Sequence, residues 1–156
     1  MTDEPITGGC FCGAIRYEST EPPVRVGMCH CRLCQKWFGA AAAMGVQFES
    51  DSFRFTKGEP KTFMTSAVLE RRFCADCGTS ILHRYVVEGP AGPNRPIVSI
   101  GTLDHPEDMP APQYHFGIES HLDKWLILEE GAPQLPAEGD PRPAKAWEEV
   151  GGDPGA

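Results

Sequence analysis

The sequence predicts a mostly β protein built as a single domain, and three observations support this. Glycine (17) and proline (15) together make up about a fifth of the 156 residues, so many turns and short strands are expected. Several segments alternate apolar and polar residues, which is typical of half-buried strands. No stretch keeps the periodicity of a long helix. The length and a hydrophobic content of 40% suit one core.

The first third of the chain is expected to hold three strands and one short helix. Residues 14–20 alternate apolar and polar side chains, and residues 24–28 form a second strand that runs into a group of cysteines. Residues 32–39 have room for about one helical turn, which Gly39 closes. Residues 40–50 are ambiguous by composition, but their second half alternates and is interpreted as a strand.

The middle of the chain is expected to form two pairs of strands. Residues 52–66 look like a hairpin that turns at Gly58. Residues 68–73 and 79–87 suit two strands joined by a knuckle turn, CADCG. Residues 88–96 are rich in glycine and proline and predict a loop.

The last third is expected to complete the sheet and then leave it. Its segments are a strand at 97–103, a loop at 105–113, and apolar segments at 114–120 and 124–130 that could close the sheet. The composition then shifts to proline, glycine and acidic residues with few apolar anchors. We therefore predict a domain at residues 1–135 and a Pro/Gly-rich C-terminal tail at residues 136–156.

Charge and hydropathy bear on partners and location. The net charge of −8 and the pI of about 5.1 describe a surface that repels phosphate backbones and anionic lipid, so neither nucleic acid nor membrane is expected as a partner. The N-terminus is acidic and has no apolar core of a secretory signal. The longest notable uncharged run, residues 37–48, is too short to span a bilayer. A cytoplasmic location is expected, and the sequence leaves the oligomeric state open.

Seven cysteines stand in groups of two, three and two. An odd number in a reducing compartment argues against a disulfide framework. Closely spaced cysteines in such a protein are more often metal ligands or catalytic groups.

The two outer pairs together supply four thiolates, the ligand set that structural zinc prefers. Cys10 and Cys12 form one clip and Cys74 and Cys77 the other, and glycines beside each clip allow tight turns. Zinc held by all four would staple the N-terminal strand to the middle of the sheet, so that its binding energy becomes folding energy. The alternative is two unrelated pairs of buried thiols.

The central group, Cys29, Cys31 and Cys34, places three thiolates where they can share one ion and leaves the fourth corner open. An open corner is typical of catalytic zinc, whereas a closed site is structural. The alternative is a second structural site that a histidine or a carboxylate closes. His30 is nearest but lies between two of the cysteines, so in an extended segment it would point the other way. His83, His115 and His121 could reach the site in three dimensions. An iron–sulfur cluster is a further alternative and would need a fourth ligand from elsewhere.

Zinc with three thiolates carries a net charge of about −1, so it is a weaker Lewis acid than zinc held by three neutral histidines. It remains thiophilic, and an incoming thiol would bind it as the thiolate. The central group therefore favours activation of a thiol substrate over hydrolysis.

The chain resembles the glutathione-dependent formaldehyde-activating enzyme family, which includes centromere protein V. The matching motifs run in the family's order and are GGCFCGAIRY, CHCRLCQKWFGA, RRFCADCGTSI, IVSIGTLDHP and PQYHFGIESHLDKW. The resemblance implies a β-tent fold of stacked antiparallel sheets with two zinc ions. It implies that the outer four cysteines bind a structural zinc and that the central three bind a second zinc near which glutathione docks.

The activity implied by the resemblance is that of a carbon–sulfur lyase, which joins glutathione and formaldehyde as S-hydroxymethylglutathione. Two alternatives stay open. One is a non-catalytic zinc-binding scaffold or partner-binding module. The other is a methionine sulfoxide reductase of the B class, which is disfavoured because no cysteine is left outside the metal clips.

Basic and aromatic residues near the cysteines are candidate substrate contacts. Arg32, Lys36, Arg71 and Arg72 could grip carboxylates, but a solvated strand edge is the favoured interpretation. Core packing is favoured for Trp37 and Phe38, and a hydrogen-bonded core position for His115.

Overall fold

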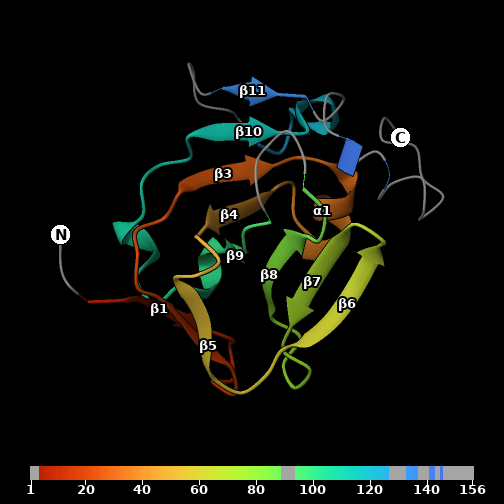
Figure 1. The fold of residues 1–156 in the computed structure, drawn as a ribbon. Coiled ribbons are helices and arrows are strands. Elements are labelled where there is room, and N and C mark those ends of the chain that lie inside the picture. The colour runs from red at the N-terminus through yellow and green to blue at the C-terminus, as the bar shows by residue number, and fades with distance from the viewer. Residues whose placement is uncertain (1–3, 89–93, 127–132, 137–140, 143–144, 146–156) are drawn as a thin grey trace.

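The computed structural model describes residues 4–88, 94–126, 133–136, 141–142 and 145. Its strands form a three-stranded sheet in the order β1-β2-β5 and an eight-stranded sheet in the order β11-β10-β3-β4-β9-β8-β7-β6, which confirms the mostly β prediction (Figure 1). The elements are β1 (Ile6–Gly9), β2 (Arg16–Ser19), β3 (Arg25–Cys29), α1 (Arg32–Phe38), β4 (Ala43–Gln47), β5 (Phe53–Lys57), β6 (Lys61–Ser66), β7 (Leu69–Phe73), β8 (Ser80–Tyr85), β9 (Ile97–Ser99), β10 (Tyr114–Phe116) and β11 (Gln134–Leu135), with short 3₁₀ turns at Ile100–Thr102, Pro106–Asp108 and Ile118–Ser120.

The large sheet is antiparallel except at one edge, where β10 runs parallel to both β3 and β11. This places β10 where the segment 114–120 was expected to close the sheet. The second segment expected there, 124–130, lies from residue 127 onward outside the described residues. No helix in the described part of the chain has the length and apolar character needed to cross a bilayer.

The predicted hairpin at residues 52–66 is wrong in its pairing. Both strands exist, but β5 pairs with β2 in the small sheet and β6 pairs with β7 in the large sheet. The chain between them crosses from one sheet to the other (Figure 1). Gly58 (φ +65°) packs so tightly on the small sheet that a Cβ there would lie 2.3 Å from the Ala14 carbonyl oxygen. Alternation predicted the strands, but it carries no information about which strand each one pairs with.

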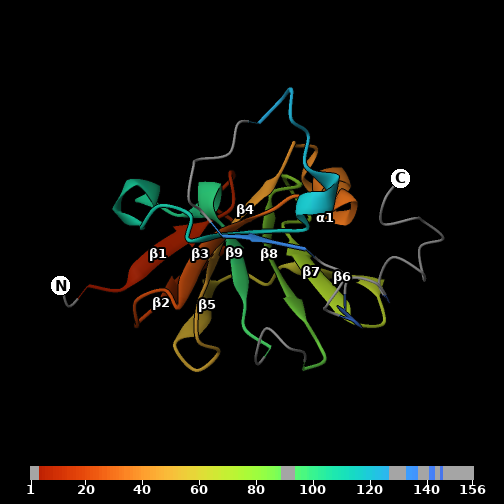
Figure 2. The ribbon, with the colours of Figure 1, turned by 90° about the horizontal axis from the view of Figure 1, so that it is seen from above.

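The core lies between the two sheets and is centred on aromatic rings. Tyr17, at 1% exposure, packs on Phe53 with ring centroids 5.3 Å apart, and Phe53 also contacts Phe48. The Tyr17 hydroxyl and the Thr102 hydroxyl are 2.7 Å apart, so this buried polar group has a partner. The packing fixes the small sheet against the large one (Figure 2).

Candidate metal centres and the adjoining pocket

The outer four cysteines meet where the two sheets approach each other. Cys10 and Cys12 lie in the turn between β1 and β2, and Cys74 and Cys77 lie in the turn between β7 and β8. The sulfurs of Cys10 and Cys12 are 3.5 Å apart, those of Cys12 and Cys74 are 3.8 Å apart, and all four lie within 4.8 Å of one another. Tetrahedral zinc with bonds of about 2.3 Å separates its sulfurs by about 3.8 Å, so this thiol cluster has the dimensions of a zinc site.

Backbone hydrogen bonds shape both turns around the sulfurs. The Gly13 amide donates to the Cys10 carbonyl at 3.1 Å, and the Gly78 amide donates to the Cys74 carbonyl at 2.9 Å. Both glycines have positive φ, at 75° and 76°, a conformation that glycine adopts without a steric cost. Because one turn belongs to each sheet, an ion held by all four sulfurs would join the sheets.

The central three cysteines form a second cluster at the end of β3. Cys29 is the last residue of β3, Cys31 precedes α1, and Cys34 lies in the first turn of that helix. The helix ends at Gly39 with φ 61°, as the sequence predicted. The Cys29 and Cys31 sulfurs are 3.3 Å apart, and all three sulfurs lie within 4.8 Å of one another. All seven cysteines are free thiols.

No fourth ligand from the described residues completes this cluster. His30 and His115 instead contact each other, with Nε2 and Nδ1 2.9 Å apart, and the His121 ring packs on His30 with centroids 4.9 Å apart. The three rings form a separate group in which His30 and His115 are buried and His121 is partly exposed. The favoured core interpretation of His115 is confirmed by its 3% exposure. The three sulfurs thus offer a ligand set with one position open.

Arg71 is the main surprise beside the cluster. A solvated strand edge was expected, but the residue is 0% exposed. Its Nη2 donates to the Cys34 sulfur at 3.5 Å, and its Nε donates to the Thr65 hydroxyl at 3.0 Å. Trp37 and Phe38 are half-buried and lie outside the hydrophobic core, and their ring centroids are 5.2 and 5.9 Å from the guanidinium carbon of Arg71.

The charge of Arg71 requires a negative partner, because an unpaired buried charge is costly. No described carboxylate forms an ion pair with it, and its Nη1 is buried without a hydrogen-bond partner among the described residues. The sulfurs are therefore its counter-charge. Hydrogen bonds from Cys29 and Cys31, and then the charge of Arg71, hold the pKa of the Cys34 thiol well below its usual value. A cation-stabilised thiolate beside two more thiols fits a thiophilic metal ion.

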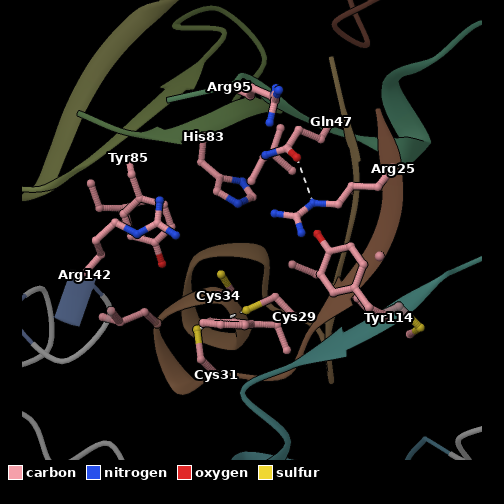
Figure 3. Close-up of a pocket in the computed structure, with 18 of the residues that line it drawn as sticks. Arg25, Cys29, Cys31, Cys34, Gln47, His83, Tyr85, Arg95, Tyr114 and Arg142 are labelled. Atoms are coloured by element: carbon pink, nitrogen blue, oxygen red, sulfur yellow. Dashed lines mark hydrogen bonds between the residues drawn. The ribbon is translucent and has the colours of Figure 1, made fainter. Parts of the chain in front are cut away.

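A pocket opens directly over the three sulfurs (Figure 3). His83 lies on its wall, and burial lowers the pKa of the His83 imidazole to about 4, so the ring is neutral at physiological pH. The other labelled polar residues around the cavity are Arg25, Gln47, Tyr85, Arg95, Tyr114 and Arg142. Neither Arg32 nor Lys36 lines this pocket.

Sequence reasoning missed these arginines, although a signal for Arg25 was present. Side chains alternate between the two faces of a strand, so Arg25, Gly27 and Cys29 share one face of β3. Gly27 leaves room for the Tyr114 ring, since a Cβ there would lie 2.3 Å from it. Once Cys29 is known to lie at the base of the pocket, the alternation of side chains along β3 places Arg25 on the pocket wall.

Comparisons with known proteins bear on this arrangement. A family model described as glutathione-dependent formaldehyde-activating enzyme matches residues 5–120. A protein of Schizosaccharomyces pombe (strain 972 / ATCC 24843), named an uncharacterized lyase, is 27% identical over 78 residues, which cover 50% of this chain and 56% of the yeast protein. The chain therefore spans little more than half of that relative. A crystal structure of a Rhodobacter sphaeroides protein aligns with a TM-score of 0.48 and 20% identity, over 64% of this chain and 88% of that one.

Proposed function

The chain belongs to the glutathione-dependent formaldehyde-activating enzyme family, and from this premise we propose that it is a zinc-dependent enzyme of the carbon–sulfur lyase type that acts on a thiol such as glutathione. The observation that supports this most is the central cluster, whose three sulfurs lie at the base of a pocket with no fourth protein ligand among the described residues. A structural ion needs no such access, whereas a substrate-binding ion does.

The two clusters take different roles in this proposal. Cys10, Cys12, Cys74 and Cys77 hold a structural zinc that joins the sheets. Cys29, Cys31 and Cys34 hold a second zinc. That second zinc, when bound, supplies an open position at which a thiol is held as its thiolate.

The protein groups around the cluster orient the substrates and offset the negative charge of the thiolate ligands. Arg71 offsets the negative charge of the thiolate ligands through its contact with Cys34. The neutral His83 ring and the pocket arginines face the space in which the substrate lies. In the reaction, the thiol sulfur forms a bond to the carbonyl carbon of formaldehyde, the carbonyl π pair becomes an alkoxide, and the proton given up by the thiol ends on that oxygen. The lyase direction reverses these changes.

Thiols add to formaldehyde rapidly without a catalyst, so the activity must be measured above that background rate. NMR measurement of exchange at equilibrium makes this possible. With glutathione and carbon-13 formaldehyde, the wild-type protein should raise the exchange rate between free formaldehyde and S-hydroxymethylglutathione. Cys31→Ser should remove the increase while a zinc assay shows the four-cysteine site still filled. An exchange rate equal to the protein-free rate would favour the alternative, a non-catalytic zinc-binding scaffold.

A further inference from the structure

His83 is a buried histidine on the wall of the pocket. It lies on β8, which is paired on both sides, so that His83 stands opposite Arg71 of β7 and Ile97 of β9. The residue is only 8% exposed, and its ring points into the cavity above the central cysteines (Figure 3). The Phe38 ring meets it edge-on, with centroids 6.2 Å apart. A side chain positioned by the interior of a sheet is held more precisely than one on a loop.

The two ring nitrogens of His83 have different surroundings. Nδ1 is fully buried and has no hydrogen-bond partner among the described residues, so Nε2 is the nitrogen that faces the cavity. Arg71, directly across the ladder, projects from the same face of the sheet, and its positive charge favours a lone pair rather than an N–H on the enclosed nitrogen. A buried N–H without an acceptor is also rarer than an acceptor without a donor. These surroundings place the proton of the neutral ring on Nε2.

The environment of His83 also keeps the ring neutral. Burial lowers the pKa of the His83 imidazole to about 4; the Cys34 thiolate opposes this shift and the Arg71 guanidinium adds to it. The ring therefore carries one proton at physiological pH. A neutral imidazole can still polarise a carbonyl oxygen by donating its N–H.

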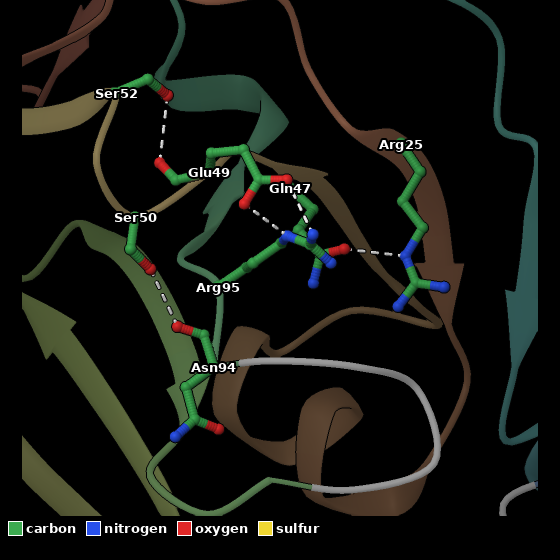
Figure 4. A network of polar contacts seen from close by, with 7 residues as sticks. All are labelled: Arg25, Gln47, Glu49, Ser50, Ser52, Asn94 and Arg95. Carbon is green, nitrogen blue, oxygen red and sulfur yellow. Dashed lines mark hydrogen bonds and ion pairs between the residues drawn. The ribbon is translucent and has the colours of Figure 1, made fainter.

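The arginines that line the same pocket already have partners of their own. The contacts are Arg25 Nε to the Gln47 side-chain oxygen at 2.8 Å, Arg95 to the Glu49 carboxylate at 2.8 and 2.7 Å, and the Arg142 guanidinium over the Tyr85 ring at 4.1 Å from its centroid. Figure 4 shows the first two of these contacts. His83 differs, because it turns an N–H donor to the open cavity. A donor fixed in a buried wall suits an oxygen that gains negative charge during a reaction.

We propose, resting on the function above, that His83 is a catalytic residue whose Nε2–H donates a hydrogen bond to the aldehyde oxygen as that oxygen becomes an alkoxide. The thiol sulfur bonds to the carbonyl carbon, the carbonyl π pair moves to the oxygen, and the proton that the thiol gives up reaches this oxygen through water. His83 keeps its own proton throughout. Its hydrogen bond strengthens as charge develops on the oxygen, so it stabilises the transition state more than the bound substrates.

Exchange of carbon-13 between free formaldehyde and S-hydroxymethylglutathione measures the catalytic part of this proposal. His83→Leu, which removes the donor, should lower the rate that the protein adds to the background by about 100- to 1,000-fold, the usual effect of losing one such donor. His83→Gln should keep part of the added rate, because the amide nitrogen of glutamine can take the place of Nε2. The affinity for glutathione, read from the absorption of cobalt(II) at the second site, should be unchanged in both variants.

His105→Gln is the matched control, because His105 is an exposed histidine (73%) that pairs with Glu107 and does not line this pocket. It should keep the wild-type exchange rate and the wild-type affinity for glutathione.

Nitrogen-15 NMR tests the position of the proton independently of activity. Long-range proton–nitrogen correlations distinguish the two neutral tautomers, and the signals missing from His83→Leu identify those of His83. In the zinc-loaded protein the ring should carry its proton on Nε2. A proton on Nδ1, or a wild-type exchange rate in folded His83→Leu, would overturn this inference and leave the proposed function standing. A wild-type protein that adds nothing to the background rate would refute the proposed function and this inference with it.

Discussion

Replacing Arg71 by glutamine should weaken metal binding at the three-cysteine cluster by about 10- to 100-fold and leave the four-cysteine cluster unaffected. The Arg71 Nη2 lies 3.5 Å from the Cys34 sulfur. Two unit charges about 4 Å apart interact by about 4 kcal/mol at an effective dielectric constant of 20. Removing the arginine also removes the cost of burying it. The net loss should approach that of one charged hydrogen bond, about 1.5–3 kcal/mol, and outer partners of metal ligands typically contribute 10- to 100-fold in affinity.

The assay is competition between the zinc-loaded protein and a chromophoric chelator, which should release the two ions in separate steps. Arg71→Gln should shift the weaker step alone, and Arg71→Lys, which keeps the charge, should shift it less. Arg72→Gln is the control, because Arg72 is adjacent in sequence but pairs with Glu70 at 2.6 Å. The reasoning is refuted if folded Arg71→Gln keeps wild-type affinity at the weaker site, or if both steps shift equally.

Three further predictions concern the clusters, the pocket and the packing. Cys74→Ser should lose the zinc that joins the sheets and, with it, the cooperative unfolding transition. Cys31→Ser should lose only the second zinc and keep the near-UV circular dichroism of the folded protein. Equal loss of structure in both variants would indicate two structural sites. Burial lowers the pKa of the His83 imidazole to about 4, whereas a histidine in the unfolded chain has a pKa near 6.5. Between these two values the unfolded chain binds a proton that the folded protein does not. The contribution of His83 to stability is therefore full above pH 6.5 and is lost as the pH falls toward 4. His83→Gln should therefore flatten the stability curve in that window by on the order of 3 kcal/mol, and urea unfolding curves that stay parallel to those of the wild type across this pH range would contradict it. Gly27→Ala should cost about 1–3 kcal/mol, because the new Cβ would lie 2.3 Å from the Tyr114 ring; unchanged urea denaturation would show that this wall is not tightly packed.

Cysteine spacing predicted which sulfurs would gather, because clips of two or three residues confine their own sulfurs to one turn. The glycine at position 39 predicted the end of α1. By contrast, β1 was not predicted, since its sequence ITGG has weak strand propensity. The strand forms because Gly8 lets the backbone pass close to Tyr17, where a Cβ would lie 2.3 Å from the phenol oxygen. That requirement is tertiary and leaves no local pattern.

The surroundings of the central cluster were the harder part to predict. Arg71 follows a buried glutamate on β7, and its sequence position alone suggests a solvent-exposed charge. Only the folded structure shows that α1 places Trp37, Phe38 and Cys34 against its guanidinium. Arg142 reaches the pocket from a segment whose composition suggests a surface tail. In both cases a charged residue is buried against a partner far away in sequence, so neither charge nor periodicity could indicate it.

Cadmium-113 NMR of the protein loaded with cadmium tests the central claim most directly, because the chemical shift of each ion reports how many sulfurs bind it. Two signals are predicted, one for each cysteine cluster. Added glutathione should move only the signal of the three-cysteine cluster, toward the position of the four-sulfur site. A single signal, or two signals that glutathione leaves in place, would contradict the view that this cluster holds a position open for a thiol.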